Sequence, residues 1–406
     1  MVALTVGCVP SEDQADPGDA IRIGATLPFS GDRAASGGAL ERALQLAANV
    51  VNANGGLLSR PLRLEIRDSH SDDKRGTETT LDLLNGVPMP FFIGPEEPRI
   101  AYQISDAIKT YKMVNLLPGL TSPTIHDSSG RAAWFRLSPS PHYLACALAK
   151  QMYNDGVRRA NAVTDPDDYS GAFATIFGRV FTDMGGTMVP GLQLPSSGSS
   201  FSEVFAAIER FSPDATLLVT SPAVGAGVLQ EWAVRGKVGK WYLGPTLNNP
   251  GLLRNVPAGV LEGLLGISPD LGPNAEAFDA YFEAETGMPP LAGAHYYFDA
   301  VALLALSIAE GIALNAAIPA AASFDLHMQK VTSAPGEIIT FDNLATGLTL
   351  AAAGVDVQYH GAAGSYVLNR EGDSIQNQAT IWQIRENTVH KIGTELCNDE
   401  EVFPGY

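Results

Sequence analysis

The chain has 406 residues, of which 45% are hydrophobic, and a formal net charge of −18 from 44 acidic and 26 basic residues. This length suits two or three globular domains, each with a core of its own. An acidic surface repels phosphate backbones, so nucleic acid is excluded as an expected partner. No run of about 18 apolar residues is present, and the most apolar long stretch, residues 300–318, predicts a buried helix and its end.

The amino-terminal segment MVALTVGC resembles the end of a bacterial lipoprotein signal, in which a cysteine is lipidated. Gly7 before Cys8 fits this pattern, whereas Thr5 stands where leucine is usual and no Lys or Arg precedes it. The apolar run is short, so we expect the coding sequence to start further upstream; an ordinary frayed terminus is the alternative. Residues 9–20 are acidic and contain two prolines, which is typical of a solvated tether. We therefore expect residues 1–19 to be a partial signal and tether, with a lipid anchor at Cys8.

Two further cysteines, Cys146 and Cys397, remain. In an exported protein they could form a disulfide. Two buried free thiols fit the sequence equally well, because the geometry of a pair cannot be deduced from sequence.

Strands and helices alternate from residue 21 onward. Residues 21–25 alternate between apolar and polar and predict a strand, and the apolar residues between Ala39 and Val51 recur with the period of a helix that ends at Gly55-Gly56. The loop between them, Ser30–Gly38, leaves the carboxyl end of a strand and is expected to face a ligand crevice. Residues 160–186 repeat this order of strand, loop, helix and double glycine.

The remaining elements follow the same reasoning and predict an α/β fold with mostly parallel sheets covered on both faces. Proline-rich crossovers are expected at residues 138–142 and 267–273. Further strands are expected at residues 62–66, 91–94, 113–117, 134–137, 187–193, 215–220, 240–243, 364–369 and 379–385. Further helices are expected at residues 76–85, 95–111, 143–155, 171–184, 201–211, 223–235, 275–286, 294–311, 320–331 and 341–353.

Motifs for catalysis, metals and cofactors are missing from the sequence. Gly225-Ala226-Gly227 opens a helix after a strand, but Gln230 occupies the third glycine position of a dinucleotide loop, so a tight turn is expected there. No Walker A sequence or G-x-S-x-G elbow occurs, and the seven histidines lack metal-ligand spacing. This pattern favours a binding protein without cofactor or metal over an enzyme.

Nine segments, taken in order, resemble the type I periplasmic binding proteins of the leucine/isoleucine/valine-binding branch. They are IRIGATLPFSGDRAASG, AANVVNANGGLLSRPLRLEIRDSHSD, FFIGPEEPR, VNLLPGLTSPTI, WFRLSPS, AVTDPDDYSGAF, WYLGP, AGAHYYFDAVALL and YHGAAGSYVLNREGD. The resemblance covers about residues 21–385. The resemblance implies two doubly wound three-layer lobes joined by three hinge strands, near residues 137–141, 266–269 and 361–366. Residues 20–138 and 267–362 would form lobe 1, and residues 139–266 and 363–398 would form lobe 2.

The same resemblance implies that a small-molecule ligand binds between the lobes, which close around it. The expected partner is an ABC permease in the inner membrane, and the expected location is the periplasm or cell surface. A ligand-sensing subunit that signals to a membrane receptor is the alternative function, and an enzyme on a doubly wound fold is a third.

Ligand contacts are expected, from the resemblance, in loops at the strand ends. They are Ser30, Ser36, Pro98, Arg99, Gly119, Leu120, Thr121, Tyr169, Ser221 and Thr246. Thr121 and Tyr169 keep the residue types of the amino-acid binders, whereas Ser221 (or Pro222) stands where a tyrosine is usual.

Three positions depart from those binders in ways that bear on the ligand. Arg99 stands where a serine holds the ligand carboxylate, Ser36 where an aromatic residue is usual, and Thr246 where an acidic residue meets the ligand ammonium. A buried ammonium without a counter-charge costs several kcal/mol. We therefore expect a small carboxylate or amide without a free ammonium, with Arg99 as a bidentate carboxylate clamp.

Each of these residues also has a purely structural interpretation. Arg99 could be solvated or paired with Glu96 or Glu97. Tyr169 could cap the core, and Thr121 and Ser122 could cap a helix.

Overall fold

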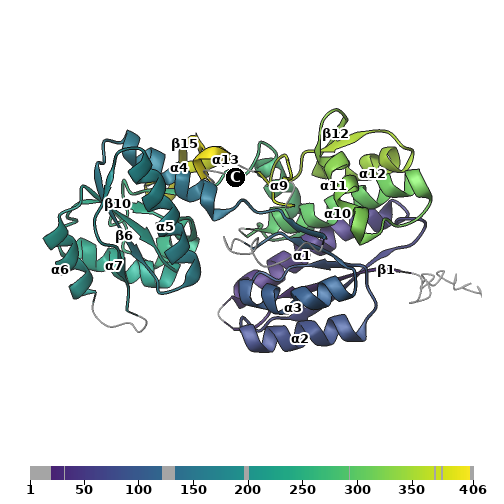
Figure 1. Cartoon of the computed structure of the whole chain (residues 1–406), viewed down its shortest axis with the longest axis horizontal. Coiled ribbons are helices and arrows are strands. Elements are labelled where there is room, and N and C mark those ends of the chain that lie inside the picture. The colour runs from purple at the N-terminus through teal and green to yellow at the C-terminus, as the bar shows by residue number, and fades with distance from the viewer. Residues whose placement is uncertain are drawn as a thin grey trace, which may run out of the picture.

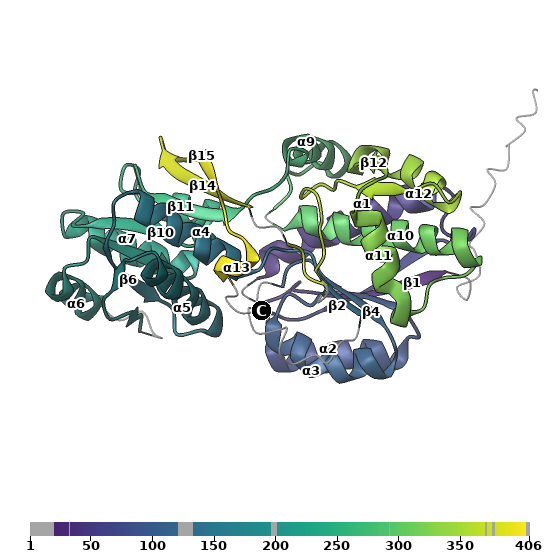
Figure 2. The same cartoon turned by 45° about the horizontal axis from the view of Figure 1, so that its top comes forward.

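The structure is a computed structural model that describes residues 20–31, 33–120, 133–195, 201–291, 293–369, 372–375 and 378–402. The described chain forms two α/β lobes that lie side by side along the long axis of the molecule (Figure 1). Lobe 1 combines the purple amino-terminal part with the green helices, whereas lobe 2 combines the teal middle of the chain with the yellow strands near the carboxyl terminus (Figure 2). The predicted fold class is confirmed, because each lobe has its own sheet and is built from separated segments.

Lobe 1 is organised around a five-stranded parallel sheet in the order β2-β1-β3-β4-β5. Ile23 of the first strand pairs with Leu64 on one side and Phe91 on the other. Helices cover both faces, so six of the seven residues of β1 are buried although the sequence alternates. The strands are β1 (Ile21–Leu27), β2 (Leu62–Asp68), β3 (Phe91–Ile93), β4 (Val114–Leu117) and β5 (Ala133–Arg136).

Two layers of helices cover this sheet. One layer contains α2 (Asp73–Gly86) and α3 (Pro98–Thr110). The other contains α1 (Ala34–Ala53), α9 (Ala275–Thr286), α10 (Ala294–Asn315), α11 (Phe324–Thr332) and α12 (Leu344–Ala352), with the two-stranded sheet β12 (Glu337–Ile339) and β13 (Val357–Tyr359) and the short 3-10 turns η3 (Ala321–Ser323) and η4 (Phe341–Asn343). The second helix begins three residues earlier than expected, because the Asp72 side chain accepts a hydrogen bond from the backbone N–H of Arg75 at 2.8 Å and caps it.

The central helix of lobe 1 is α10. By length and composition it is apolar enough to cross a membrane, but 83% of its most apolar window is buried inside the protein. Every residue from Ala294 to Gly311 is buried. A helix that is apolar on all sides packs in the interior of a large domain, which agrees with the buried helix expected from residues 300–318.

Lobe 2 contains a mixed sheet in the order β15-β14-β11-β10-β9-β6-β7, with β8 beside β6. Strand β14 runs antiparallel to both of its neighbours, β11 and β15, and all other pairs in this sheet are parallel. The expected strand 187–193 is split in two around Pro190, which has no N–H to donate to a ladder. The strands are β6 (Arg159–Thr164), β7 (Thr187–Met188), β8 (Leu192–Gln193), β9 (Ala215–Val219), β10 (Lys240–Leu243), β11 (Leu265–Pro269), β14 (Gln378–Arg385) and β15 (Thr388–Leu396).

Helices cover both faces of this second sheet as well. One face is packed by α4 (Pro141–Asn154) and α5 (Asp168–Asp183), with the short α13 (Asp399–Val402) beside them. The other face is packed by α6 (Ser202–Phe211), α7 (Pro222–Val234) and α8 (Pro250–Asn255), with the 3-10 turn η2 (Pro245–Leu247).

Three crossovers connect the lobes, and two of them differ from the expected positions. Residues 137–140 form the first, as expected. Residues 266–269 belong to β11 of the second sheet, so the second crossing follows at residues 270–274. Residues 361–366 pack in the core of lobe 1, and the third crossing comes later, between Gly372 and β14. The prediction of a strand at residues 364–369 is wrong, because only isolated β-bridges form there.

The crossovers are held together by buried polar contacts. Arg136 at the end of β5 is 2% exposed and pairs with Asp373, with Nε to Oδ1 at 3.0 Å. Gly272 of the second crossing lies so close to Gly364 that a Cβ on Gly272 would come within 2.5 Å of the Gly364 Cα. The first and third connections are therefore joined by an ion pair, and the second is packed against lobe 1.

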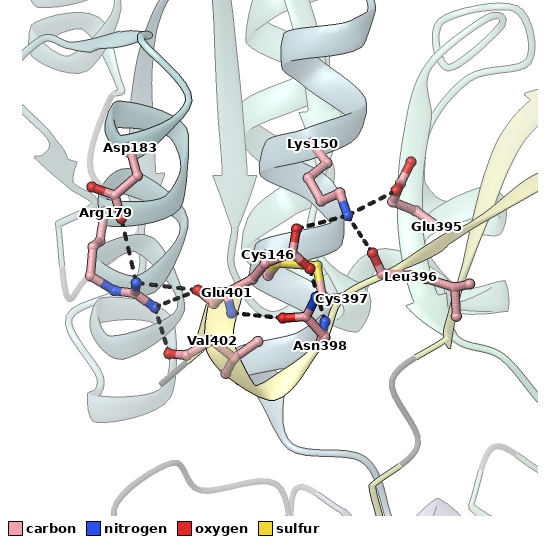
Figure 3. Close-up of a disulfide and its surroundings, with 10 residues drawn as sticks. All are labelled: Cys146, Lys150, Arg179, Asp183, Glu395, Leu396, Cys397, Asn398, Glu401 and Val402. Carbon is pink, nitrogen blue, oxygen red and sulfur yellow. Dashed lines mark hydrogen bonds and ion pairs between the residues drawn. A yellow bond between two sulfur atoms is a disulfide. The ribbon is translucent and has the colours of Figure 1, made fainter. Parts of the chain in front are cut away.

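Cys146 and Cys397 form a disulfide, which resolves the alternative left open by the sequence. It joins α4 to the chain just after β15 across 251 residues of sequence, with the two Cα atoms 6.2 Å apart. Figure 3 shows that ion pairs and hydrogen bonds surround it: Lys150 binds the Leu396 carbonyl at 2.6 Å, and Arg179 binds the Val402 carbonyl at 2.6 Å. The carboxyl-terminal segment is thus clamped onto α4 and α5.

Candidate ligand site

Six loops at the carboxyl ends of parallel strands carry the residues predicted to bind ligand. In lobe 1 they follow β1, β3 and β4, and in lobe 2 they follow β6, β9 and β10. The first crossover leads from the carboxyl end of β5 to the first turn of α4, and the far end of α4 leads into β6. The carboxyl ends of both sheets therefore lie toward this crossover, at the edge where open α/β sheets bind ligands.

The loop after β1 is shorter than the sequence suggested. A loop was expected through Gly38, but α1 begins at Ala34, and Ser36 lies in its first turn with its hydroxyl donating to the Arg33 carbonyl at 2.8 Å. Gly37 is needed there because a Cβ would come within 2.3 Å of the Pro28 carbonyl oxygen. Close packing of the helix on the strand end, rather than helix propensity, decides where this helix begins.

Asp68, at the end of β2, organises what remains of this loop. Its Oδ1 accepts from the backbone N–H groups of Phe29 at 2.9 Å and His70 at 2.8 Å, and its Oδ2 accepts from the Ser30 hydroxyl at 2.7 Å. Burial raises the pKa of Asp68, but these hydrogen bonds, the one from Ser30 first among them, lower it more, so its pKa lies below the ordinary value. The Ser30 hydroxyl is therefore engaged within the loop scaffold.

The loop after β3 carries two adjacent carboxylates that the sequence analysis had considered only as partners for an arginine. Glu97 is 5% exposed; its Oε1 accepts from the Ser69 hydroxyl at 2.8 Å, whereas its Oε2 has no hydrogen-bond partner in the described structure. Glu96 packs against the next loop, since a Cβ on Gly119 would come within 2.7 Å of its Oε1. Burial raises the pKa of Glu96 to about 7, although the positive charge of Arg33 opposes the rise.

Tyr297, in the first turn of α10, contributes a hydroxyl to the same place. Its side chain is fully buried, and its hydroxyl lies next to the Glu96 carboxylate, with which it interacts by hydrogen bonding. Burial raises the pKa of Tyr297, and the nearby charges of Glu96 and Glu97 raise it further. The side chains of Glu96, Glu97 and Tyr297, from two separate parts of lobe 1, thus lie close together where little water reaches them.

The raised pKa of Glu96 predicts how stability depends on pH. Because the pKa is about 7 in the folded state and 4.5 as the ordinary value, the folded protein binds this proton more tightly. The stability that the folded protein gains by binding this proton is fully present below pH 4.5 and is lost as the pH rises through 7. We expect Glu96→Gln, which imitates the protonated group, to stabilise the protein by about 3 kcal/mol at pH 8 and by little at pH 4.5. Urea unfolding at both pH values measures this; an equal effect at both would contradict the assignment.

Arg99 lies on the surface rather than beside these carboxylates. Its side chain is 70% exposed, and its Nε lies 3.8 Å from Oδ2 of Asp73 in α2. The pairing with Glu96 or Glu97 that the sequence allowed is therefore not formed, and Asp73 takes that role. Pro98 occupies the first turn of α3.

The loop after β4 contains Gly119 and Leu120. Leu120 is buried, and its carbonyl accepts a hydrogen bond from the Ser138 hydroxyl in the first crossover at 3.1 Å. Thr121, Ser122 and Cys8 lie outside the described residues.

In lobe 2, a network at the strand ends is built around Asp165, which the sequence analysis missed. It directly follows β6; its Oδ1 accepts from the Thr220 hydroxyl at 2.6 Å and its Oδ2 from the Ser221 backbone N–H at 2.7 Å. The exposed Thr246 donates its hydroxyl to the Thr220 carbonyl at 2.7 Å. The signal for Asp165 was present: an acidic residue directly after a buried strand lies at the ligand edge of the sheet.

Tyr169 lies in the first turn of α5, half-buried against Phe173 with ring centroids 6.2 Å apart. Burial raises its pKa, and the charge of Asp167 adds to the rise. Its ring thus covers part of the lobe 2 core.

A cavity of about 910 Å³ lies at the opposite edge of the lobe 1 sheet. It is lined by the beginnings of β3, β4 and β5 and by residues 318–322. Ligands of open α/β sheets bind at the carboxyl ends of the strands, so we assign this cavity no part in the site.

The model of the family described as "Periplasmic binding protein" matches residues 20–347. The chain belongs to the periplasmic binding protein family. Among sequence relatives, the Leu/Ile/Val-binding protein BraC3 of Rhizobium johnstonii is 28% identical over 105 residues. That match covers 26% of this periplasmic binding protein and 28% of the relative.

Solved structures extend the similarity of this periplasmic binding protein to nearly its whole length. A leucine-binding protein, LivK, from Thermotoga maritima has a TM-score of 0.74 and 19% identity, covering 93% of this chain and 99% of its own. A solute-binding protein of an ABC transporter from R. palustris, in complex with benzoate, has a TM-score of 0.70 and 19% identity, covering 95% and 100%. At these identities the comparison shows the fold.

Proposed function

We propose that this protein captures a small polar solute between its two lobes outside the cytoplasm and delivers it to an ABC permease. The observation that carries the proposal is the polar lining of strand-end loops in both lobes, beside the crossovers, in a chain of this family. In lobe 1 these groups are Glu96 and Glu97, with Tyr297 of α10 beside them, and in lobe 2 they are Asp165 and Thr246. The lobes close on a solute that touches both. A lipid anchor at Cys8 would hold the protein near its permease.

The relatives' ligands indicate the range of solutes to test. One similar structure is named as a leucine-binding protein and another contains benzoate, so amino acids, amides and small carboxylates form the first panel. A solute at 100 times its dissociation constant should stabilise the folded state by about 2.7 kcal/mol. Thermal unfolding with each solute measures this, and small-angle scattering should show a smaller radius of gyration with the same solute. If no solute changes either quantity, the proposal is wrong.

A matched pair of threonines tests whether lobe 2 takes part. Thr246 and the exposed Thr175 of α5 each donate their hydroxyl to a backbone carbonyl, at 2.7 and 2.9 Å. Thr246→Val should weaken binding of the stabilising solute about fivefold, the equivalent of about 1 kcal/mol for one hydrogen bond, whereas Thr175→Val should leave it unchanged. Calorimetry measures the affinity of both variants for the solute. If the two variants bind it equally tightly, Thr246 is not part of the site.

A further inference from the structure

We propose that the solute carries a positively charged nitrogen, as an ammonium or guanidinium group, and that Glu96 and Glu97 of lobe 1 receive it beside the Tyr297 hydroxyl. This inference rests on the proposed function and names the solute class of the same site.

The geometry is that of an incomplete polar site. Glu97 is 5% exposed, and its buried Oε2 has no hydrogen-bond partner in the described structure. The fully buried Tyr297 hydroxyl lies next to the Glu96 carboxylate, which interacts with it by charge and hydrogen bonding. Buried polar atoms are nearly always paired in folded proteins, because leaving one unpaired is costly. The two groups come from the start of α3 and the first turn of α10, so no single local turn explains both. A donor supplied by the solute would satisfy Glu97 Oε2 beside the Glu96 carboxylate and the Tyr297 hydroxyl.

The charges at this place favour a cation. Glu96 and Glu97 are adjacent acids, and no Lys or Arg lies within ion-pair distance of either among the described residues. The nearest opposing charge is Arg33, an exposed residue before α1, which acts on Glu96 at longer range. An ammonium offers three donors and a guanidinium five, and both are strongly favoured beside desolvated carboxylates.

Gly119 shows that space at this spot is reserved for the Glu96 side chain. A Cβ at position 119 would come within 2.7 Å of Glu96 Oε1 and 3.0 Å of its Cγ. The carboxylate thus lies between the loops after β3 and β4, two of the strand ends that form the ligand edge of lobe 1. Glu96 is held at the site rather than extended into solvent.

This inference revises the expectation of a ligand without an ammonium. That expectation rested on Thr246, which replaces the acidic counter-charge in lobe 2. In the proposed site, Glu96 and Glu97 of lobe 1 supply the counter-charge in place of that residue. The exposed Arg99 pairs with Asp73 and does not neutralise them.

Pairs of solutes that differ by one positive charge test the inference. We would compare L-lysine with L-norleucine, L-arginine with L-citrulline, and L-leucine with 4-methylpentanoate by calorimetry at pH 8. The more positively charged member of at least one pair should bind at least tenfold more tightly. In Glu96→Gln this preference should fall at least tenfold, and in Tyr297→Phe the affinity for the same solute should fall about threefold. The exposed Glu41 of α1 provides the control, since Glu41→Gln removes the same charge from the same lobe.

The pH dependence of binding gives an independent readout. The charged groups that face Glu96 are Glu97 beside it, Arg33 before α1 and Tyr297 of α10. A cation binds the ionised form of Glu96, so affinity should fall as the pH drops from 8 to 6, and this dependence should weaken in Glu96→Gln.

Three results would overturn the inference, and they also separate it from the proposed function. If benzoate or 4-methylpentanoate binds and no cationic probe does, the solute-binding function stands and the cation assignment is wrong. If Glu96→Gln keeps the full charge preference while remaining folded by circular dichroism, Glu96 is not the receiving group. If no solute binds at all, both proposals are wrong.

Discussion

Asp299→Ala is expected to destabilise the protein by roughly 4 kcal/mol or more, because it leaves several buried donors without an acceptor. Asp299, in α10, is fully buried and accepts four hydrogen bonds. The Tyr359 and Tyr366 hydroxyls donate at 2.7 Å each, and the backbone N–H groups of Ala362 and Ala363 donate at 2.8 Å each. Each orphaned buried donor costs about 1–3 kcal/mol.

Asp299 also explains the path of the chain before the third crossover. Burial raises its pKa, and the four donors, led by the Ala363 N–H, oppose that rise. A Cβ on Gly361 would come within 2.4 Å of Asp299 Oδ2, so only glycine allows this approach. The carboxylate therefore fastens residues 361–366 to the core helix of lobe 1, where the sequence had suggested a hinge and a strand.

Urea unfolding followed by circular dichroism measures the effect. Tyr359→Phe removes a single donor and should cost only about 1 kcal/mol. Asp325→Ala, at an exposed position of α11, should stay within about 0.5 kcal/mol of the wild type. An Asp299→Ala protein as stable as the Asp325→Ala protein would show that the four hydrogen bonds do not contribute as argued.

Loss of the disulfide is the second large effect that we expect. Removing a cross-link frees the unfolded chain, and the double variant Cys146→Ser/Cys397→Ser should lose about 2–5 kcal/mol. The bond closes a loop with a sequence separation of 251 residues, which places the expected loss toward the upper part of that range in the chain-entropy account. Lys150 still pairs with Glu401 at 3.1 Å and with Glu395 at 3.5 Å, so the carboxyl-terminal segment keeps part of its attachment.

Thermal unfolding with and without a reducing agent tests this. The wild type should unfold at a lower temperature once reduced, and the double variant should unfold at that lower temperature in both conditions. A variant that unfolds at the temperature of the oxidised wild type would contradict the prediction.

The sequence by itself determined the architecture, because hydrophobic period and turn residues are local properties. Residues 240–243 and 275–286 were predicted with the bounds that the structure shows, and the helix predicted at residues 294–311 coincides with the buried part of α10. β15 escaped prediction because it is an edge strand whose residues are mostly exposed, so its sequence carries no alternation.

Tertiary structure alone decided the details of the site and its supports, because they depend on atoms brought together from distant segments. The pairing of Cys146 with Cys397, the four donors around Asp299 and the start of α1 against Pro28 are all of this kind. For the site, the strand-end positions followed from the sequence, but the chemistry did not. Arg99 looked like the charged group of lobe 1, yet it is exposed, whereas Glu97 is buried with one unpaired oxygen and burial raises the pKa of Glu96. Burial and pairing are properties of the folded chain, so the sequence alone could not show which charged side chains are buried at the strand ends.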